Sequence, residues 1–498
     1  MTEQRVSPQE QRWRVVSEQQ PTPRSEAIAT GDLAIYATNN PQTRITLGYQ
    51  NIDSVLNAAK REEAEKKKGT YGQRNGDFPR DIRVNGGTQT ISTPDTGVFV
   101  PELTQPIVDQ FTYLSTLRGG DPIKIWTPQD VRNADNVLIA PYINDAQTEA
   151  MIQSELGAES IGLPSGMVDT LKNKGKFREI VDQLDLETLR VADYRATTLD
   201  EVQEAAIHML SFQENLYRDL DMEDYTRGVV IQSVNSDGGF GSVMVKEGTD
   251  KDGNNVLRVV MDGKLAKVIE GTERAKWSAA FAESQEYLKS VIDGEKEDQV
   301  IVSRFIEHDD SPGGSVVVIN GEVIGLGWNG QLINEGSNAC VGTGTYIPKT
   351  RRAKALKEVY ETQSITDTEK ILQEAAKRTG IDFSIVNGLA GIDYMTPSKR
   401  EHELQVRRHD SPKWNGPKPS AYAVECNARG TNWTDAIKLL MYMHGDEQTV
   451  NNMRKRIEEG IQTYDAIPLA DDVTGEEMRE ELLERYAVYK QTERGLVL

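Results

Sequence analysis

Short apolar segments alternate with stretches of helical periodicity from about residue 97 onward. The first apolar segments are 98–100, 123–126 and 137–140, and helix-like stretches separate them. Strands that alternate with helices in this way are typical of a parallel sheet with helical crossovers. We therefore predict a small α/β domain over residues 96–165.

The pattern changes after Pro164. Helical periodicity covers residues 172–184 and 199–219, and two strands then flank a glycine-rich tip at 237–241, as in a hairpin. A series of short strands with hairpin spacing, interrupted by a helix near 277–292, continues to about residue 327 and indicates antiparallel sheets. We predict two α+β lobes, over residues 166–295 and 296–440.

The two ends of the chain differ from this pattern. Residues 1–95 are rich in Gln, Glu, Arg, Thr, Asn and Gly, which predicts a polar and partly disordered extension. Residues 441–498 are charged and helical in pattern, and packing or a homo-oligomer contact is favoured over catalysis. Within the second lobe, Thr366 and Glu369 have the spacing of a capping box, and Gly380 suits the end of that helix.

Composition narrows the class of protein. The 498 residues, 37% hydrophobic and 27% charged, are globular in composition, and no apolar run reaches the roughly 20 residues that span a bilayer. The chain starts without the apolar segment of a secretory signal, so a cytoplasmic location is expected. A net charge of −21 opposes general binding to nucleic acid or anionic membranes, although it leaves room for a local basic pocket.

The positions of cysteine and histidine argue against a disulfide framework or redox pair and against a zinc site. Cys340 and Cys426 lie far apart and form neither a CxxC pair nor a disulfide framework. The five histidines include no HExxH pair. A zinc site is therefore not predicted.

The clearest candidate chemistry lies on a strand near residue 425. Alternation along a strand places Glu425 and Asn427 on one face and Cys426 on the other. Hard oxygen ligands of this kind suit Mg²⁺, and Asp393 on a neighbouring strand would supply a second carboxylate. Arg429 follows where the strand ends, with a planar fork that fits phosphate or carboxylate oxygens. An ordinary buried strand with a polar end is the alternative.

The glycine-rich tip is a second candidate. Gly238, Gly239 and Gly241 permit close approach and positive φ, so their backbone amides could contact phosphates. Glycines at a hairpin tip also occur for turn geometry alone, and that alternative stays open.

Taken in order over residues 97–440, these elements resemble the ATP-grasp superfamily of carboxylate-amine and carboxylate-thiol ligases. Residues 425–429 read Glu-Cys-Asn-Ala-Arg and are similar to the family's Glu-x-Asn-Pro-Arg signature, with Ala428 in place of proline. Asp393 looks like the family's upstream metal-binding aspartate. The resemblance implies a small parallel-sheet domain followed by two α+β lobes that sandwich ATP and Mg²⁺, with Asp393, Glu425 and Asn427 as metal ligands.

Two further segments resemble the phosphate-binding parts of the family. Lys174 best matches the lysine that meets the nucleotide phosphates, with Lys172 and Lys176 as close competitors. Gln232 stands on the strand where many members carry a second such lysine. A glutamine can hydrogen-bond without neutralising charge, so Lys246 or an arginine elsewhere would have to supply the missing positive charge.

A third segment resembles the linker against which adenine is held. Backbone groups of Arg304 and Phe305 are the expected partners of the base. Glu307 is favoured over Asp309 and Asp310 as the partner of the ribose hydroxyls.

The implied reaction activates a carboxylate as an acylphosphate, which an amine then attacks with release of ADP and phosphate. Lys174 and Arg429 would stabilise the transferred charge, and the substrates would be a small-molecule carboxylate and an amine, such as an amino acid or peptide. Some relatives with a preceding α/β domain form peptide bonds. Three alternatives remain: a carboxylate-thiol ligase, an ATP-binding module without turnover, suggested by Gln232 and Ala428, and an interaction protein that uses its N-terminal extension.

Overall fold

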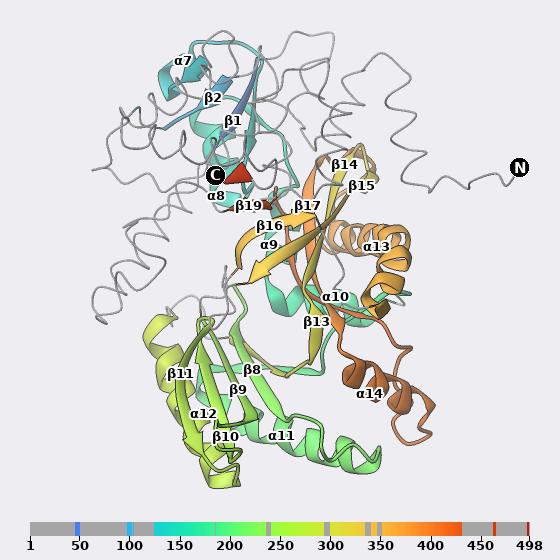
Figure 1. Cartoon of the computed structure of the whole chain (residues 1–498). Coiled ribbons are helices and arrows are strands. Elements are labelled where there is room, and N and C mark those ends of the chain that lie inside the picture. The colour runs from blue at the N-terminus through green and yellow to red at the C-terminus, as the bar shows by residue number, and fades with distance from the viewer. Residues whose placement is uncertain are drawn as a thin grey trace, which may run out of the picture.

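The computed structural model describes residues 45–49, 97–101, 103, 124–184, 186–235, 241–292, 299–333, 340–345, 351–430, 462–464 and 496–497. The strands in these segments form a five-stranded, a six-stranded and a nine-stranded sheet, here called the N-terminal, small-lobe and large-lobe sheets. Figure 1 shows the N-terminal sheet at one end, the small-lobe sheet with its helices at the other, and the large-lobe sheet between them. The predicted fold class, a parallel-sheet domain followed by two α+β lobes, is confirmed.

The N-terminal sheet is parallel, with the strand order β3-β2-β1-β4-β5. Its elements are β1 (Ile45–Tyr49), β2 (Gly97–Phe99), β3 (Lys124–Trp126), α7 (Pro128–Arg132), β4 (Val137–Pro141), α8 (Ala146–Ala150), the π-helical turn Met151–Glu155 and β5 (Glu159–Ser160). The central strand β1 comes from the segment assigned to the polar extension by sequence. Its Leu47 is fully buried beside Ile139, and the strand escapes notice because its apolar run is short and polar residues flank it.

The small-lobe sheet is antiparallel, with the order β11-β10-β9-β8-β12-β7. Its strands are β7 (Tyr194–Thr198), β8 (Gly228–Ser233), β9 (Ser242–Thr249), β10 (Asn255–Met261), β11 (Lys264–Glu270) and β12 (Gln299–Arg304). The 3-10 turn Leu199–Glu201, α11 (Val202–Asp219) and α12 (Arg274–Val291) pack on one face, where Ile231 and Val245 meet Trp277. Because side chains alternate along a strand, Gln232 lies on the opposite face.

The large-lobe sheet has the order β20-β19-β16-β15-β14-β17-β18-β6, and β13 pairs with β17. Its strands are β6 (Leu189–Arg190), β13 (His308–Asp310), β14 (Pro312–Ile319), β15 (Glu322–Ile333), β16 (Cys340–Thr345), β17 (Gly388–Pro397), β18 (Ala421–Asn427), β19 (Gln462–Tyr464) and β20 (Leu496–Val497). Its helices are α9 (Ser165–Lys172), α10 (Lys174–Gln183), α13 (Arg351–Arg378), the 3-10 turn Phe383–Ile385 and α14 (Lys399–Asp410). Residues of α9, α10 and α13 share one core with β14, β17 and β18.

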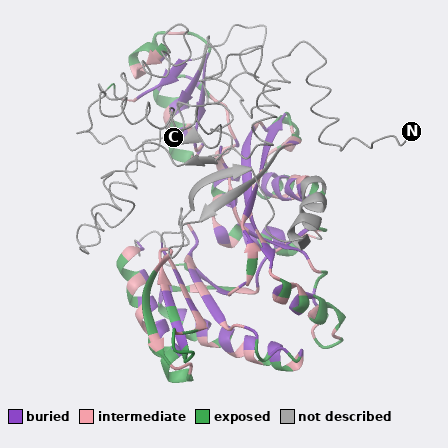
Figure 2. Ribbon diagram, viewed as in Figure 1, coloured by how far each residue is buried: buried purple, intermediate pink, exposed green. Residues whose placement is uncertain are grey.

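Burial follows this arrangement. Figure 2 shows buried residues along β14 and β17, which lie inside the large-lobe sheet, whereas β11, the edge strand of the small-lobe sheet, is mostly exposed. Helices α9 and α10 precede the small-lobe sheet in the chain but pack on the large-lobe core. The segment that carries Lys174 is thereby held against β18.

The capping-box prediction in the second lobe is wrong. Helix α13 begins at Arg351, so Thr366 lies inside it, because the preceding residues include good helix formers and the helix propagates through that position. The end of the helix is as predicted. Gly380 has φ +70°, its N–H donates to Lys377, and Ile381 N–H donates to Ala376, which is a Schellman motif.

Several sequence predictions concern residues outside the described part of the chain. They include Gly238 and Gly239 of the tip and most of the helical tail at 441–498, of which only the strands β19 and β20 are described. Within the described segments, no helix is both long and apolar enough to span a bilayer.

Candidate functional site

The neighbouring strands β17 and β18 bring three polar side chains together. Asp393 pairs with Glu425 and Gly391 with Asn427, and Nδ2 of Asn427 donates to Oδ2 of Asp393 at 3.1 Å. Cys426 points the other way into the core and is 5% exposed, where burial raises the pKa of its thiol. The half-buried face opposite Cys426 therefore carries two carboxylates and one amide.

Lys174 joins this set from helix α10. Its Nζ lies 3.1 Å from Oε2 of Glu425, and the residue is only 4% exposed. Its backbone N–H donates to the carbonyl of Val234 at 2.8 Å, which ties the start of α10 to the strand that enters the glycine-rich hairpin. Lys172 instead ends α9, and Lys176 is exposed. Among the three lysines named from sequence, Lys174 is the one with an ion pair to the carboxylate set.

Gln232 lies beside an arginine that the sequence did not single out. Nη2 of Arg178, on α10, donates to Oε1 of Gln232 at 3.0 Å, and Nη1 donates to the hydroxyl of Ser303 on β12. Lys174 begins the same helix, four residues earlier. A buried guanidinium thus lies where Gln232 itself brings no charge.

Lys246 lies at the other end of the same sheet face. It pairs with Gly228, whereas Ser242 pairs with Gln232, so four residues of strand, roughly 13 Å, separate the two positions. Its Nζ is 4.6 Å from the centroid of the Phe305 ring. Burial lowers the pKa of Lys246, a nearby arginine adds to that effect, and a carboxylate opposes it.

The linker residues Arg304 and Phe305 use their backbone donors within the protein. The N–H of Arg304 donates to the carbonyl of Asp193 and that of Phe305 to the carbonyl of Gly228, both at 2.9 Å. A base placed against this strand would therefore have to meet other atoms, such as the carbonyl oxygens. Nearby, Glu307 is half-buried and accepts a hydrogen bond from Oγ1 of Thr226 at 2.6 Å.

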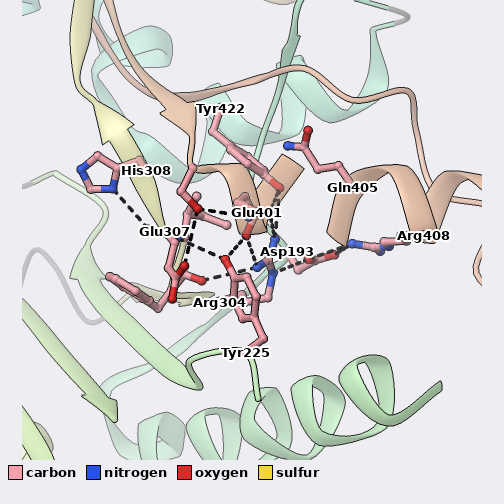
Figure 3. Close-up of polar contacts among 12 residues, drawn as sticks. Asp193, Tyr225, Arg304, Glu307, His308, Glu401, Gln405, Arg408 and Tyr422 are labelled. Atoms are coloured by element: carbon pink, nitrogen blue, oxygen red, sulfur yellow. Dashed lines mark hydrogen bonds and ion pairs between the residues drawn. The ribbon is translucent and has the colours of Figure 1, made fainter. Parts of the chain in front are cut away.

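The side chain of Arg304 belongs to a buried polar network (Figure 3). Its guanidinium donates to both oxygens of Glu401 on α14, at 2.7 and 2.9 Å, and to Asp193 at 3.1 Å. The hydroxyls of Tyr225 and Tyr422 also donate to Glu401. This network connects β12 of the small lobe with α14 and β18 of the large lobe.

Asp193 has a second cation beside it. Nη1 of Arg408 donates to both of its carboxylate oxygens, at 2.7 and 2.9 Å. Burial raises the pKa of Asp193, but Arg304 and Arg408 outweigh that effect and hold the pKa below its usual range. Sequence reasoning missed this network, because its members are far apart in the chain and match no spacing rule.

Arg429 lies against the N-terminal domain. Its Nη1 donates to the hydroxyl of Tyr142 at 2.6 Å, and its guanidinium lies 5.0 Å from the centroid of that ring. Tyr142 directly follows β4. The N-terminal domain thus supplies a contact to the arginine that follows β18.

The predicted residues form two groups on facing parts of the lobes. Asp393, Glu425, Asn427, Lys174 and Gln232 gather at one end, and Lys246, Arg304, Phe305 and Glu307 lie toward the other. Gly241 has φ +65° and its carbonyl accepts the N–H of Ser233 at 3.0 Å, which places the described end of the hairpin at the first group.

The first group suits a hard cation. No set of three His, Cys, Asp or Glu side chains that could hold a metal occurs in the described segments. Two carboxylates and an amide oxygen nevertheless fit Mg²⁺, which commonly takes one or two carboxylates and completes its shell with phosphate oxygens and water. Lys174 contacts the carboxylate of Glu425, and the Asn427 amide contacts that of Asp393.

No protein-family model and no curated protein matches the chain. Among solved structures, it is similar to biotin carboxylase from Campylobacter jejuni, with 12% identity and a TM-score of 0.41 over 83% of this chain and 70% of that one. N5-carboxyaminoimidazole synthase from Aspergillus clavatus has 10% identity and a TM-score of 0.40, over 82% and 79%. D-alanyl-alanine synthetase A from Vibrio cholerae has 13% identity and a TM-score of 0.34, over 64% and 76%.

These three enzymes are ATP-grasp carboxylate-amine ligases, the superfamily that the sequence motifs resemble.

Proposed function

We propose that the chain is an ATP-dependent ligase that activates a carboxylate as an acylphosphate and joins it to an amine. The observation that carries the proposal is the convergence of Asp393, Glu425 and Asn427 with the buried Lys174 at one end of the face between the lobes. Oxygen ligands beside a buried ammonium group match what a metal-bound polyphosphate needs.

Asp393, Glu425 and Asn427 would hold Mg²⁺. When bound, the metal supplies charge neutralisation and a fixed geometry for the nucleotide phosphates. Lys174 would then exchange its contact with Glu425 for a phosphate oxygen. The reason is electrostatic. The ammonium group lies next to the carboxylate that would bind the metal, so a bound cation would displace it from Glu425 toward a phosphate oxygen.

Arg429 would stabilise the transferred phosphoryl group or the acylphosphate, since its planar fork presents two parallel N–H donors. The contact with Tyr142 supports this role, because a ring and a hydroxyl restrict the rotamers of a long side chain. Because Tyr142 belongs to the N-terminal domain, that domain would help to bind the carboxylate or the amine. An amino acid or peptide is the proposed class of amine.

The far end of the face would bind the nucleoside. The backbone carbonyl groups of Arg304 and Phe305 would contact the base, since their N–H groups donate within the protein, and Glu307 would accept a hydrogen bond from a ribose hydroxyl. The hairpin around residues 237–241 would cover the phosphates and keep water from the acylphosphate.

Release of ADP tests the proposal. The chain is incubated with ATP, Mg²⁺ and pools of carboxylic acids and amines, and the product is identified by mass. Glu425→Gln should abolish ADP release, because it removes the negative charge of a proposed metal ligand with little change in the shape of the side chain. Glu283→Gln is the matched control, since Glu283 also pairs with a lysine, Lys267 at 2.6 Å, but on the exposed surface. Full activity of Glu425→Gln would refute the metal assignment.

A second candidate is an ATP-binding module without turnover. The neutral Gln232 favours it, because many relatives carry a lysine at this position. Tight, Mg²⁺-dependent binding of ATP without ADP release in any pool would support this candidate. Thiols in a separate pool distinguish a carboxylate-thiol ligase, whose product is a thioester. Absence of any thermal stabilisation by ATP with Mg²⁺ would refute both kinds of ligase and the ATP-binding module, and would favour an interaction protein.

A further inference from the structure

Arg178 is a buried cation with an incomplete set of partners. The residue is 4% exposed, and its hydrogen-bond partners among the described residues are neutral: the hydroxyl of Ser303 and the amide oxygen of Gln232. Its buried Nε has no hydrogen-bond partner in the described part of the chain. A buried guanidinium held mainly by neutral groups is costly unless an anion completes its environment.

The electrostatics of the site agree with this reading. Burial lowers the pKa of Arg178 to about 10, and the nearby Tyr194 and Glu425 only partly oppose that effect. Even this lowered pKa leaves the guanidinium charged at neutral pH. A charge is therefore maintained in a place where the protein itself neutralises it incompletely.

The position of Arg178 is set by three elements. Helix α10 carries it four residues, about one turn, after Lys174. Gln232 on β8 and Ser303 on β12 lie on the sheet face opposite α11 and α12, because their neighbours Ile231 and Val302 face those helices. The guanidinium thus lies between α10 and the small-lobe sheet, on the side of Glu425.

We propose that Arg178 binds the phosphate groups of the nucleotide and takes the place of the lysine that is absent at Gln232. The assignment rests on the proposed function, since it needs a nucleotide at this site. Gln232 acts as a positioning residue, because its amide oxygen holds one guanidinium nitrogen and so aims the rest of the fork. Lys246 does not fill this place, since it lies at the Phe305 end of the face.

A charge-relocation experiment tests the proposal. Binding of ATP·Mg²⁺ and of adenosine is measured by calorimetry for the wild type, Arg178→Gln and the double variant Arg178→Gln/Gln232→Lys. Loss of the charge-assisted hydrogen bonds should weaken ATP binding by about 10- to 150-fold. Adenosine binding should not change, because adenosine carries no phosphate. The double variant should recover much of the ATP affinity, since it returns a cation to β8.

Two controls keep the outcomes distinct. Arg218→Gln removes an exposed arginine of α11 and should leave ATP affinity unchanged. Arg178→Lys keeps the charge but loses the fork, and should fall between the wild type and Arg178→Gln; it also serves if Arg178→Gln does not fold. Thermal unfolding reports the fold of each variant.

Failure of the inference and failure of the proposed function have different signatures. A wild type that binds no ATP·Mg²⁺ overturns the proposed function itself. A wild type that binds ATP, together with an Arg178→Gln variant that binds it equally well, overturns the role of Arg178 alone. Equal losses of ATP and adenosine affinity that Gln232→Lys does not rescue would show that Arg178 only supports the fold.

Discussion

Replacing Glu401 with glutamine is expected to destabilise the chain strongly. Glu401 is fully buried, and its carboxylate accepts two hydrogen bonds from Arg304, at 2.7 and 2.9 Å, and one from each of two tyrosine hydroxyls. Glutamine keeps the size of the side chain but removes its charge. It also turns one acceptor oxygen into a donor that faces other donors.

The magnitude follows from the pair that is broken. Removing one partner of a buried ion pair typically costs about 3–5 kcal/mol, because the other charge stays buried without compensation. Arg304 keeps Asp193 at 3.1 Å, so the loss should lie near the lower end, about 3 kcal/mol. The urea dependence of unfolding is about 1–3 kcal/mol/M for small proteins and larger for a chain of 498 residues, so the unfolding midpoint should fall by about 1 M at most.

The assay is urea unfolding followed by circular dichroism. Glu403→Gln is the matched control on the same helix, since its partner Arg407 lies at 2.6 Å but both side chains are largely exposed. Exposed pairs of this spacing contribute about 0.3–0.5 kcal/mol, so the control should hardly move the midpoint. The double variant Arg304→Met/Glu401→Leu should recover part of the loss, because apolar replacement of both partners is often neutral.

Two outcomes would contradict this reasoning. A shift for Glu401→Gln no larger than that for Glu403→Gln would mean that the buried pair contributes little. The free energy of unfolding lost by the double variant could also equal the sum of the losses caused by Arg304→Met and Glu401→Leu alone. That result would mean that the two residues act independently rather than as a charge pair.

Two further predictions concern acid stability and packing. The pKa of Asp193 is lower in the folded chain than the unfolded value of about 3.9, so the stability that this carboxylate contributes is present above about pH 4 and is lost as pH falls through the folded pKa. Thermal midpoints of the wild type and Asp193→Asn should therefore differ clearly at neutral pH and converge in acid; a constant difference would contradict the linkage. A Cβ at Gly388 would lie 2.5 Å from the backbone nitrogen of Leu163, so Gly388→Ala should lower the melting temperature by the equivalent of about 1–3 kcal/mol. An unchanged melting temperature would show that β17 and residue 163 separate easily.

Much of the fold was predictable from local patterns. The strands β8, β9 and β12 and the hairpin of β14 and β15 lie close to where alternation and turn signals placed them. The strand β1 was missed because five residues within a polar segment carry too little periodicity. The start of α13 was missed because a capping-box spacing also occurs inside continuous helices.

The sequence by itself determined which residues share a face with which. Two-residue alternation is a local property, so Glu425 and Asn427 could be placed opposite Cys426 without any tertiary information. Tertiary structure alone decided that Arg178 meets Gln232 across 54 residues and that Arg304 meets Glu401 across 97. Such contacts depend on how whole helices and sheets pack, and no spacing rule within one segment encodes them.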